Sequence, residues 1–337
     1  MIVTLKDNIK VTEIENLIEE LKKKNISSKL VEFGENKLLL LSGETEKIDE
    51  KSLASNEMVS KVVRISTPYK LVSRSFQTEN TIIKVGDVEF GGKDLVMIAG
   101  PCSVESGAQI EEIAKLVKKS GANILRGGTY KPRKSPYFFQ GLGSEGIDYL
   151  VEAKKKLGIP IVSEIPSIEK IDEFKDVDIL QVGARNMQNY ELLKALGKTN
   201  KPILLKRGMS NTIEELLLSA EYIASFGNNK IILCERGIRT FETATRNTLD
   251  LSAVCLLKKL THLPVLVDPS HATGNWELVE SMSLAAIASG CDGLMIEVHN
   301  NPNSALSDGG QSIKVDRFDN IVNKGRKIAE IIGRNIK

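Results

Sequence analysis

The feature that most constrains the fold of this chain is a regular alternation of short apolar segments with helical patterns. The apolar segments have the length of buried strands and lie at residues 95–99, 123–125, 160–163, 179–182, 202–205, 230–233, 264–267 and 293–296. Apolar residues at helical spacing fill the gaps, at residues 108–119, 147–157, 168–174, 189–196, 212–226, 244–259, 277–289 and 315–332. Eight strands that alternate with eight helices predict an α/β fold, a (β/α)8 TIM barrel, with its site at the carboxyl ends of the strands.

A doubly wound sheet is the alternative for the same alternation. Its dinucleotide-binding forms carry G-x-G-x-x-G after the first strand, and here the first predicted strand is followed by G-P-C-S at residues 100–103. The barrel is therefore the favoured architecture. Residues 82–90, with Gly86 and Asp87 in the middle, predict a hairpin that closes the bottom of the barrel.

Residues 1–66 are predicted to form a separate unit. Strand-like segments at 1–5, 28–33, 37–41 and 59–65 and helical patterns at 12–24 and 46–54 give a βαββαβ order, a ferredoxin-like α+β domain. We expect residues 67–80 to be a polar linker and residues 81–337 to be the catalytic barrel. Because the first 101 residues contain no His or Cys, the unit is expected to regulate the protein or to mediate packing or dimerisation.

Composition excludes several classes of protein. The chain has 46 Lys and Arg against 44 Asp and Glu and only 5% aromatic residues, which argues against binding to nucleic acid. It lacks an apolar leader and any run of about 18 apolar residues, so we expect a cytoplasmic protein that does not enter the membrane. Its four cysteines are too widely spaced for a disulfide framework or a zinc finger and are expected to be reduced.

Charged or metal-capable residues follow nearly every predicted strand, whereas the strand interiors are apolar. The carboxyl ends of all barrel strands meet on one rim, so these residues predict a functional site. One stretch, L-R-G-G-T-Y-K-P-R-K-S-P at residues 125–136, combines several cations with two glycines and suits a phosphorylated anion. A solvated basic loop is the alternative for that stretch taken alone.

The rim residues fall into two chemical sets. The long cations are numerous enough for one phosphate and one carboxylate: Arg126, Lys131, Arg185, Lys206 and Arg236. The other set offers sulfur, nitrogen and oxygen donors from predicted strands 1, 7 and 8 and the loop after strand 8: Cys102, His271, Glu297 and Asp308. Those strands become neighbours when a barrel closes, and a thiolate with an imidazole suits Mn²⁺, Fe²⁺ or Zn²⁺ better than Mg²⁺. Taken singly, Cys102 could be a small buried apolar residue and Asp308 a turn residue.

A series of motifs runs through the predicted barrel in order. They are G-P-C-S-V-E-S at 100–106, K-P-R at 131–133, S-P-Y-F-F-Q-G-L-G at 135–143, G-A-R-N at 183–186, L-L-K-R-G at 204–208, C-E-R-G-I-R-T-F-E at 234–242, D-P-S-H at 268–271 and L-S-D-G at 306–309. Together they resemble 3-deoxy-D-arabino-heptulosonate 7-phosphate (DAHP) synthase. By pattern and length of residues 1–66, the chain resembles the microbial branch with an N-terminal ferredoxin-like regulatory domain.

The resemblance implies a metal-dependent, aldol-type condensation of phosphoenolpyruvate with erythrose 4-phosphate and water, which gives DAHP and phosphate. This reaction is the first step of the shikimate pathway to the aromatic amino acids. The resemblance assigns the cation set to phosphoenolpyruvate, the donor set to one divalent metal ion and Arg133 to erythrose 4-phosphate. We further hypothesise that Lys131 donates a proton near the aldehyde and that Glu164 orients the water. For residues 1–66 it implies feedback inhibition by tyrosine or phenylalanine between paired domains, in a homo-oligomer that is at least a dimer and is expected to be a tetramer.

The sequence departs from the family pattern at Lys134, where Thr or Ser is usual; a lysine could still meet the aldose phosphate as a point charge. The related 3-deoxy-manno-octulosonate 8-phosphate synthase takes arabinose 5-phosphate and usually has K-A-N-R-S-S in place of K-P-R, so the sequence favours the heptulosonate reaction. Two other hypotheses are a non-catalytic sensor of aromatic amino acids and a metal-dependent aldolase acting on pyruvate. The intact cation and donor sets argue against the sensor, and the pyruvate aldolase has little need of five cations.

Overall fold

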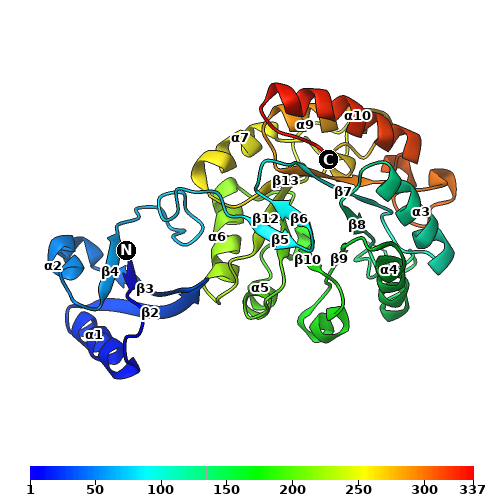
Figure 1. Ribbon diagram of the computed structural model, residues 1–337. Coiled ribbons are helices and arrows are strands. Elements are labelled where there is room, and N and C mark those ends of the chain that lie inside the picture. Colours follow the sequence, from blue (N-terminus) through cyan, green and yellow to red (C-terminus); the bar gives the residue numbers. More distant parts are fainter. Residues whose placement is uncertain (134) are drawn as a thin grey trace.

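A closed parallel barrel forms the larger part of the computed structural model, which describes residues 1–133 and 135–337 (Figure 1). Lys134, for which we expect a contact with the aldose phosphate, lies outside the described residues. The barrel strands are β7 (Val96–Gly100), β8 (Ile124–Arg126), β9 (Ile161–Glu164), β10 (Ile179–Val182), β11 (Ile203–Lys206), β12 (Ile231–Glu235), β13 (Val265–Val267) and β14 (Gly293–Glu297). Strand β14 pairs with β7 and closes the barrel, which confirms the predicted fold and all eight predicted strands.

Helices cover the outside of the barrel, as predicted. They are α3 (Gly107–Lys119), α4 (Ser144–Leu157), α5 (Tyr190–Gly197), α6 (Ile213–Ala224), α7 (Leu251–Leu260), α9 (Trp276–Ala288) and α10 (Val315–Ile331), with the 3-10 helix η2 (Ile168–Phe174) in the third position. Polar residues cap the amino-terminal ends of several of these helices. Ser106 caps α3 by accepting a hydrogen bond from the backbone N–H of Gln109, and Thr212 forms a capping box with Glu215 at the start of α6. In the described part of the chain, every helix is too short or too polar to cross a lipid bilayer.

Two helix predictions after strands β12 and β13 need correction. The predicted helix at 244–259 begins only at Leu251, because Asp250 caps it and the preceding residues form a loop in which Ile238 and Thr248 bridge. The short helix α8 (Pro269–Thr273) follows β13 directly and was not predicted. Both segments lie at the rim of the barrel, where contacts between loops, rather than local hydrophobic periodicity, determine the secondary structure.

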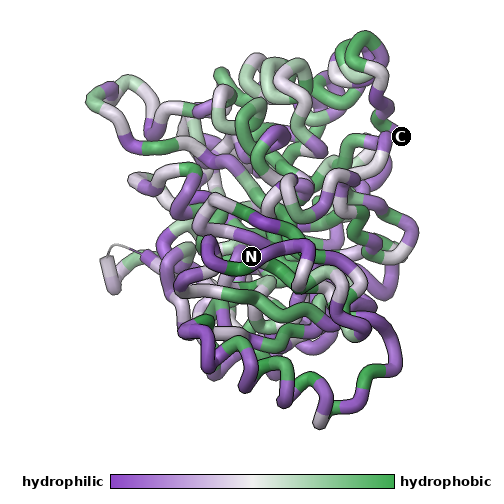
Figure 2. The backbone as a smooth tube through the Cα atoms, turned by 90° about the vertical axis from the view of Figure 1, so that its left-hand side faces the viewer, coloured by the Kyte–Doolittle hydropathy of each residue, from purple (hydrophilic) through white to green (hydrophobic). Residues whose placement is uncertain are grey.

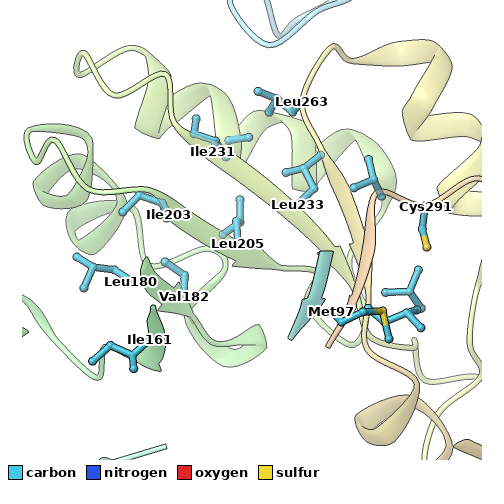
Figure 3. Close-up of a cluster of buried hydrophobic side chains, with 14 of the residues drawn as sticks. Met97, Ile161, Leu180, Val182, Ile203, Leu205, Ile231, Leu233, Leu263 and Cys291 are labelled. Carbon is cyan, nitrogen blue, oxygen red and sulfur yellow. The ribbon is translucent and has the colours of Figure 1, made fainter. Parts of the chain in front are cut away.

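Apolar side chains fill the barrel from inside and from outside. Those on one face of each strand point outward under the helices, as Leu180, Val182, Ile203 and Leu205 do in Figure 3. Alternate residues point inward and pack with the hairpin of β5 (Ile83–Val85) and β6 (Val88–Phe90). The hairpin therefore closes the amino-terminal end of the barrel, as predicted, and leaves the carboxyl end for polar side chains.

The N-terminal unit is an antiparallel sheet in the order β2-β3-β1-β4, covered on one face by helices. Its elements are β1 (Ile2–Leu5), α1 (Val11–Lys23), β2 (Ile26–Phe33), β3 (Asn36–Gly43), α2 (Glu50–Ala54) and β4 (Val59–Val63). This is the predicted ferredoxin-like order, except that the expected helix at 46–54 is divided. A 3-10 turn, η1 (Thr45–Lys47), precedes α2, and Asp49 caps α2. Hydrophobic and hydrophilic residues alternate along α1 at the bottom of Figure 2, as expected for a helix with one buried face.

The open face of this sheet packs against helix α6 of the barrel and the connector before it. Phe33 meets Phe76 edge to face with ring centroids 5.9 Å apart. Lys29 donates a hydrogen bond of 2.8 Å to the carbonyl oxygen of Ser225, at the end of α6. Glu221 of α6 accepts hydrogen bonds of 3.0 and 3.1 Å from the backbone N–H groups of Leu71 and Val72 in the connector. The N-terminal unit and the barrel thus share one apolar core through α6.

His262 joins the connector to the barrel and generates a prediction about acid stability. Its ring is 1% exposed, with Nε2 2.8 Å from the carbonyl oxygen of Leu71 and Nδ1 2.6 Å from the hydroxyl of Thr81. Burial lowers the pKa of His262 from 6.5 to about 4. Between these two values the unfolded chain binds a proton that the folded protein does not, so the stability that His262 contributes above pH 6.5 is lost as the pH falls toward 4. We expect the wild-type protein to lose up to about 3 kcal/mol more than His262→Gln over this range.

The measurement is the free energy of unfolding in urea at several pH values between 7 and 4, for both proteins. Glutamine keeps an amide donor and acceptor but does not titrate. Equal losses of stability in the two proteins would show that His262 does not carry this pH dependence.

Candidate active site

A cavity of about 310 Å³ lies at the carboxyl rim of the barrel, on the side opposite the hairpin. Six cations and three other ionisable residues line it: Lys131, Arg133, Arg185, Lys206, Arg236, Arg246, Glu164, His271 and Asp308. Four of the five cations expected to bind an anion are among them, together with Arg133. No sequence pattern singled out Arg246, because it lies in a segment that was predicted to be helical.

The four predicted donors come together beside this cavity. One ligand atom from each of Cys102, His271, Glu297 and Asp308 lies within 4.8 Å of the others. Cys102 follows β7, His271 lies in α8 after β13, Glu297 ends β14, and Asp308 precedes the 3-10 helix η5 (Gly309–Gln311). Because β13, β14 and β7 are adjacent in the closed barrel, four residues spread over more than 200 positions meet at one point.

Asp268 fixes the orientation of His271. Its Oδ2 lies 2.7 Å from Nδ1 of His271, and its Oδ1 accepts the backbone N–H of the same residue at 2.9 Å. With Nδ1–H donated to Asp268, the lone pair of Nε2 faces Glu297, whose Oε1 is 3.3 Å away. Burial lowers the pKa of His271 even though Asp268 and Glu297 raise it, which favours the neutral imidazole that a metal ion requires.

The thiol and the two carboxylates of the set differ in charge. Burial, assisted by the charge of Glu297, raises the pKa of Cys102 to about 12, so the free thiol is neutral near pH 7. Its Sγ lies 3.1 Å from the hydroxyl of Ser307 and 3.4 Å from Oδ2 of Asp308. Burial raises the pKa of Glu297, but nearby His271 and Arg126 outweigh it and hold the pKa below its ordinary value. The buried carboxylate of Glu297 and the partly exposed carboxylate of Asp308 therefore balance the charge of a divalent cation before the thiol ionises.

Arg126 differs from the other predicted cations. It is buried, its Nη1 pairs with Oε1 of Glu297, and its Nη2 lies 3.5 Å from the carbonyl oxygen of Cys102. Lys206 lines the cavity but also pairs with the buried carboxylate of Asp268. Asp268 thus holds one cation and the imidazole of His271 at once, a role that the D-P-S-H motif did not reveal because the cation comes from another strand.

Two glycines of the predicted motifs give their neighbours room. A Cβ on Gly128 would lie 2.9 Å from Cδ of Lys131, whose Nζ donates to the carbonyl oxygen of Cys102 at 3.1 Å. A Cβ on Gly183 would lie 2.1 Å from Oε1 of Glu164, which could not then keep its place in the cavity wall. Glycine at these positions lets Lys131 and Glu164 face the same space.

Arg236 and Arg133 carry donors that the described residues do not satisfy. Nη1 of Arg236 and Nε of Arg133 are buried without a hydrogen-bond partner among residues 1–133 and 135–337. Burial lowers the pKa of Arg236, which is 4% exposed. A buried, unpaired charged donor is costly, so its presence in a cavity wall points to an anionic ligand that would satisfy it.

A second network shapes the loop that carries Arg246. The buried carboxylate of Glu235 accepts the backbone N–H of Gly237 at 2.7 Å and a bond of 3.0 Å from Arg207. Arg207 also donates to Asp250, the cap of α7, at 3.0 Å. The loop between β12 and α7 is therefore anchored at both ends by one arginine and two acids, and Arg246 reaches the cavity from its middle.

Comparison with known proteins gives consistent matches. A model described as the DAHP synthetase I family matches residues 75–333, and one described as the DAHP synthase ferredoxin-like domain matches residues 1–67. A phospho-2-dehydro-3-deoxyheptonate aldolase of Thermotoga maritima is 48% identical over 336 residues, 99% of each chain. A 2-dehydro-3-deoxyphosphooctonate aldolase of Geobacter sulfurreducens is 33% identical over 272 residues, 74% of this chain and 98% of that protein.

Two solved structures agree with these matches. The crystal structure of the Thermotoga maritima DAHP synthase superposes with a TM-score of 0.80 at 46% identity and covers 100% of this chain and 99% of that chain. A truncated form of the Thermotoga maritima 3-deoxy-D-arabino-heptulosonate 7-phosphate synthase gives a TM-score of 0.75 at 49% identity. It covers 80% of this chain and 99% of that chain.

The position of Asp268 predicts a large cost for its neutralisation. Asp268→Asn keeps the shape of the side chain but leaves the buried ammonium group of Lys206 without its carboxylate. We expect a loss of about 3–5 kcal/mol in the free energy of unfolding, measured with denaturant. The matched control is Glu280→Gln, which breaks an ion pair with Lys324, whose side chain is 58% exposed. This change should lower the free energy of unfolding by less than about 1 kcal/mol. Similar losses for the two variants would contradict this account of Asp268.

Proposed function

The chain belongs to the DAHP synthetase I family, and we propose that its rim cavity condenses phosphoenolpyruvate with erythrose 4-phosphate and water to give DAHP and phosphate. This reaction opens the shikimate pathway to the aromatic amino acids. The observation that carries the proposal is a cavity with six cations in its wall beside a set of four metal donors. Cys102 and Glu297 of that set are buried, and His271 and Asp308 line the cavity. Positively charged side chains bind the two phosphorylated substrates. A metal ion beside those side chains would act as a Lewis acid that polarises the aldehyde.

We assign phosphoenolpyruvate to the cations Lys131, Arg185, Lys206, Arg236 and Arg126. The first four line the cavity, and the unpaired Nη1 of Arg236 is a donor for the phosphoryl or carboxylate oxygens. Arg126 would keep Glu297 in place with one nitrogen and offer its remaining N–H groups to the same anion. Several charge-assisted bonds to the phosphate stabilise it as a leaving group, where negative charge develops.

The donor set fits one divalent metal ion. Cys102, His271, Glu297 and Asp308 supply a sulfur, a neutral imidazole nitrogen and two carboxylates, a combination that favours Mn²⁺, Fe²⁺ or Zn²⁺ over Mg²⁺. When bound, the ion would supply a Lewis acid for the aldehyde oxygen. Asp268 would orient the imidazole, and Cys102 would have to lose its proton, which binding itself favours.

The remaining chemistry falls to Lys131 and Glu164. The C3 atom of the enol attacks the aldehyde carbon, water adds at C2, and phosphate leaves with cleavage of the C–O bond. Lys131, held against the carbonyl oxygen of Cys102, is placed to donate a proton to the aldehyde oxygen, which becomes the new hydroxyl. Glu164 is held by a bond of 2.9 Å from Gln181 and lines the same cavity, where it would orient the water.

We assign the aldose phosphate to Arg133 at the outer part of the cavity. Its guanidinium lies 5.9 Å from the ring centroid of Phe138 and 3.8 Å from Oδ1 of Asp308. The K-P-R motif supports erythrose 4-phosphate as the substrate, and the 33% identical octulosonate relative keeps arabinose 5-phosphate as the second candidate. Lys134, outside the described residues, is left as a sequence-based candidate for the same phosphate.

We propose that residues 1–66 form a regulatory domain that binds tyrosine or phenylalanine in a homo-oligomer expected to be a tetramer, with residues 67–80 as the linker. A cavity of about 460 Å³ in this unit supports the proposal. Its wall combines apolar side chains, among them Leu17, Leu21 and Leu53, with the charged residues Lys24 and Asp49. Such a wall offers an apolar surface for an aromatic ring and opposite charges for an amino acid's ammonium and carboxylate groups.

The function is tested by release of phosphate from phosphoenolpyruvate. We expect release with erythrose 4-phosphate, complete loss in excess chelator and recovery with Mn²⁺, Fe²⁺ or Zn²⁺. Arabinose 5-phosphate is the matched control, and its kcat/KM is expected to be lower. A higher kcat/KM with arabinose 5-phosphate would favour the octulosonate reaction, and no release with either aldose would favour an amino acid sensor. Condensation of pyruvate in place of phosphoenolpyruvate would indicate the pyruvate aldolase.

Truncation tests the role of the N-terminal unit. A chain that begins at Thr67 keeps Leu71 and Val72, whose N–H groups satisfy the partly buried carboxylate of Glu221. We expect it to retain metal-dependent condensation and to lose inhibition by tyrosine or phenylalanine, which is measured from initial rates. A chain that begins at Ser75 removes those donors and should be less stable. Inhibition that persists in the Thr67 chain would place the effector site in the barrel, whereas a folded but inactive chain would show that the unit supports catalysis directly.

A further inference from the structure

Gln311 lies between the metal donor set and Arg246 and uses both ends of its amide. Its Nε2 donates a bond of 2.6 Å to Oε2 of Glu297, and its Oε1 accepts a bond of 2.7 Å from Nη1 of Arg246. The side chain is 2% exposed, so water cannot easily replace either partner. It stands three residues after Asp308, in the 3-10 helix η5.

This arrangement restrains Glu297 from its second side. Oε1 of Glu297 pairs with Arg126 and faces Nε2 of His271. These contacts hold one oxygen only, so the carboxylate could still rotate about its Cγ–Cδ bond if Oε2 had no partner. Gln311 supplies that hold. A carboxylate bonded at both oxygens presents its lone pairs in one direction, which lowers the cost of placing it beside a metal ion.

Arg246 decides which way the amide of Gln311 points. A guanidinium has donors and no acceptor, so it requires the oxygen of the amide and turns the nitrogen toward Glu297. The same guanidinium lies 3.5 Å from Oδ2 of Asp308, so it also contacts the fourth donor. Without Arg246 the amide could reverse and place its oxygen against a carboxylate oxygen, which is repulsive.

We propose that Gln311 is a positioning residue for the metal ligand Glu297 and that Arg246 sets the orientation of its amide. This inference rests on the proposed metal site and adds two residues that bind no metal themselves. It explains why Arg246, reached by a long anchored loop, belongs to the site. It also explains why a glutamine is buried among charged groups.

The chain provides a matched control in Gln181. This residue is 3% exposed and donates from Nε2 to Oε2 of Glu164 at 2.9 Å, so it makes the same kind of bond to a glutamate outside the donor set. Methionine is similar in length to glutamine and makes neither bond. Gln311→Met and Gln181→Met each remove one hydrogen bond to a glutamate, and only the first removes a bond to a metal donor, together with the bond from Arg246.

The experiment measures the affinity of the full-length, metal-free protein for Zn²⁺ and Mn²⁺ by competition with a chromophoric chelator, without substrates. We expect Gln311→Met to bind each ion about 10- to 100-fold more weakly and Gln181→Met to bind it as the wild type does. Thermal unfolding of each metal-free protein checks that it is folded. If Gln311→Met does not fold, Gln311→Asn, which is too short to reach both partners, replaces it with the same expected loss.

Wild type and Cys102→Ala separate this inference from the proposed function. Weak binding by the wild type, or unchanged binding by Cys102→Ala, would overturn the metal site itself. If the wild type binds tightly and Cys102→Ala does not, then wild-type affinity in Gln311→Met would overturn the role of Gln311 alone.

A double-mutant cycle tests Arg246. If Arg246 acts through Gln311, the loss of affinity in the double variant Arg246→Met, Gln311→Met is smaller than the sum of the two single losses in free energy. The cycle removes the effect of the arginine's charge on the ion, because that effect is present in both arms. Additive losses would overturn the claim that Arg246 orients the amide.

Discussion

The pairing of β14 with β7 is the interaction on which the site depends. It closes the barrel in a register that sets Glu297 opposite Gly100, two residues before Cys102. A shift of one residue would turn Glu297 toward the helices and an apolar neighbour toward the cavity. Closure also brings β13 beside β14, so that His271 faces Glu297. The donor set is therefore a consequence of strand register, and no local segment could assemble it.

Burial of charge is the second constraint, and the chain meets it by pairing. Lys206 with Asp268 and Arg126 with Glu297 are ion pairs with almost no exposure, and removal of one partner from such a pair leaves a charge that is costly in a low-dielectric interior. The partners also have chemical tasks, since Asp268 orients an imidazole and Glu297 is a metal donor. Arg236 is the exception, because one of its nitrogens has no partner among the described residues. The pairs fix the wall of the cavity, and the excess of positive charge in that wall favours phosphorylated ligands.

Sequence patterns predicted the barrel, its strands and the four donors because these depend on local periodicity and on the end of each strand. The strands are mostly apolar, and three of the donors lie at a strand end or a few residues beyond it, as Glu297 does at the end of β14. Asp308 lies further on, in the L-S-D-G motif of the loop after β14. Arg246, Asp268 and Gln311 escaped prediction for a common physical reason. Each makes a side-chain contact with a residue distant in sequence: Arg246 and Gln311 are 65 positions apart, and Asp268 pairs with Lys206, 62 positions away, as well as with nearby His271. Helical spacing in 244–259 predicted α7 but placed its start too early, at a part of the loop whose anchors, Arg207 and Glu235, lie outside that segment.

Helix α6 relates the N-terminal unit to the rim. At its carboxyl end, the carbonyl oxygen of Ser225 accepts a hydrogen bond from Lys29, and its partly buried Glu221 accepts the backbone N–H of Leu71 in the connector. Its amino end begins at Ile213, shortly after the segment in which Lys206 faces the cavity and Arg207 anchors the loop of Arg246. A ligand of the N-terminal unit can change catalysis only if it binds two arrangements of the protein with different affinity, and a 10-fold difference corresponds to about 1.4 kcal/mol. One short polar contact or a small apolar area is worth that much, so a difference of one contact between the N-terminal unit and α6 would be large enough to provide such a preference.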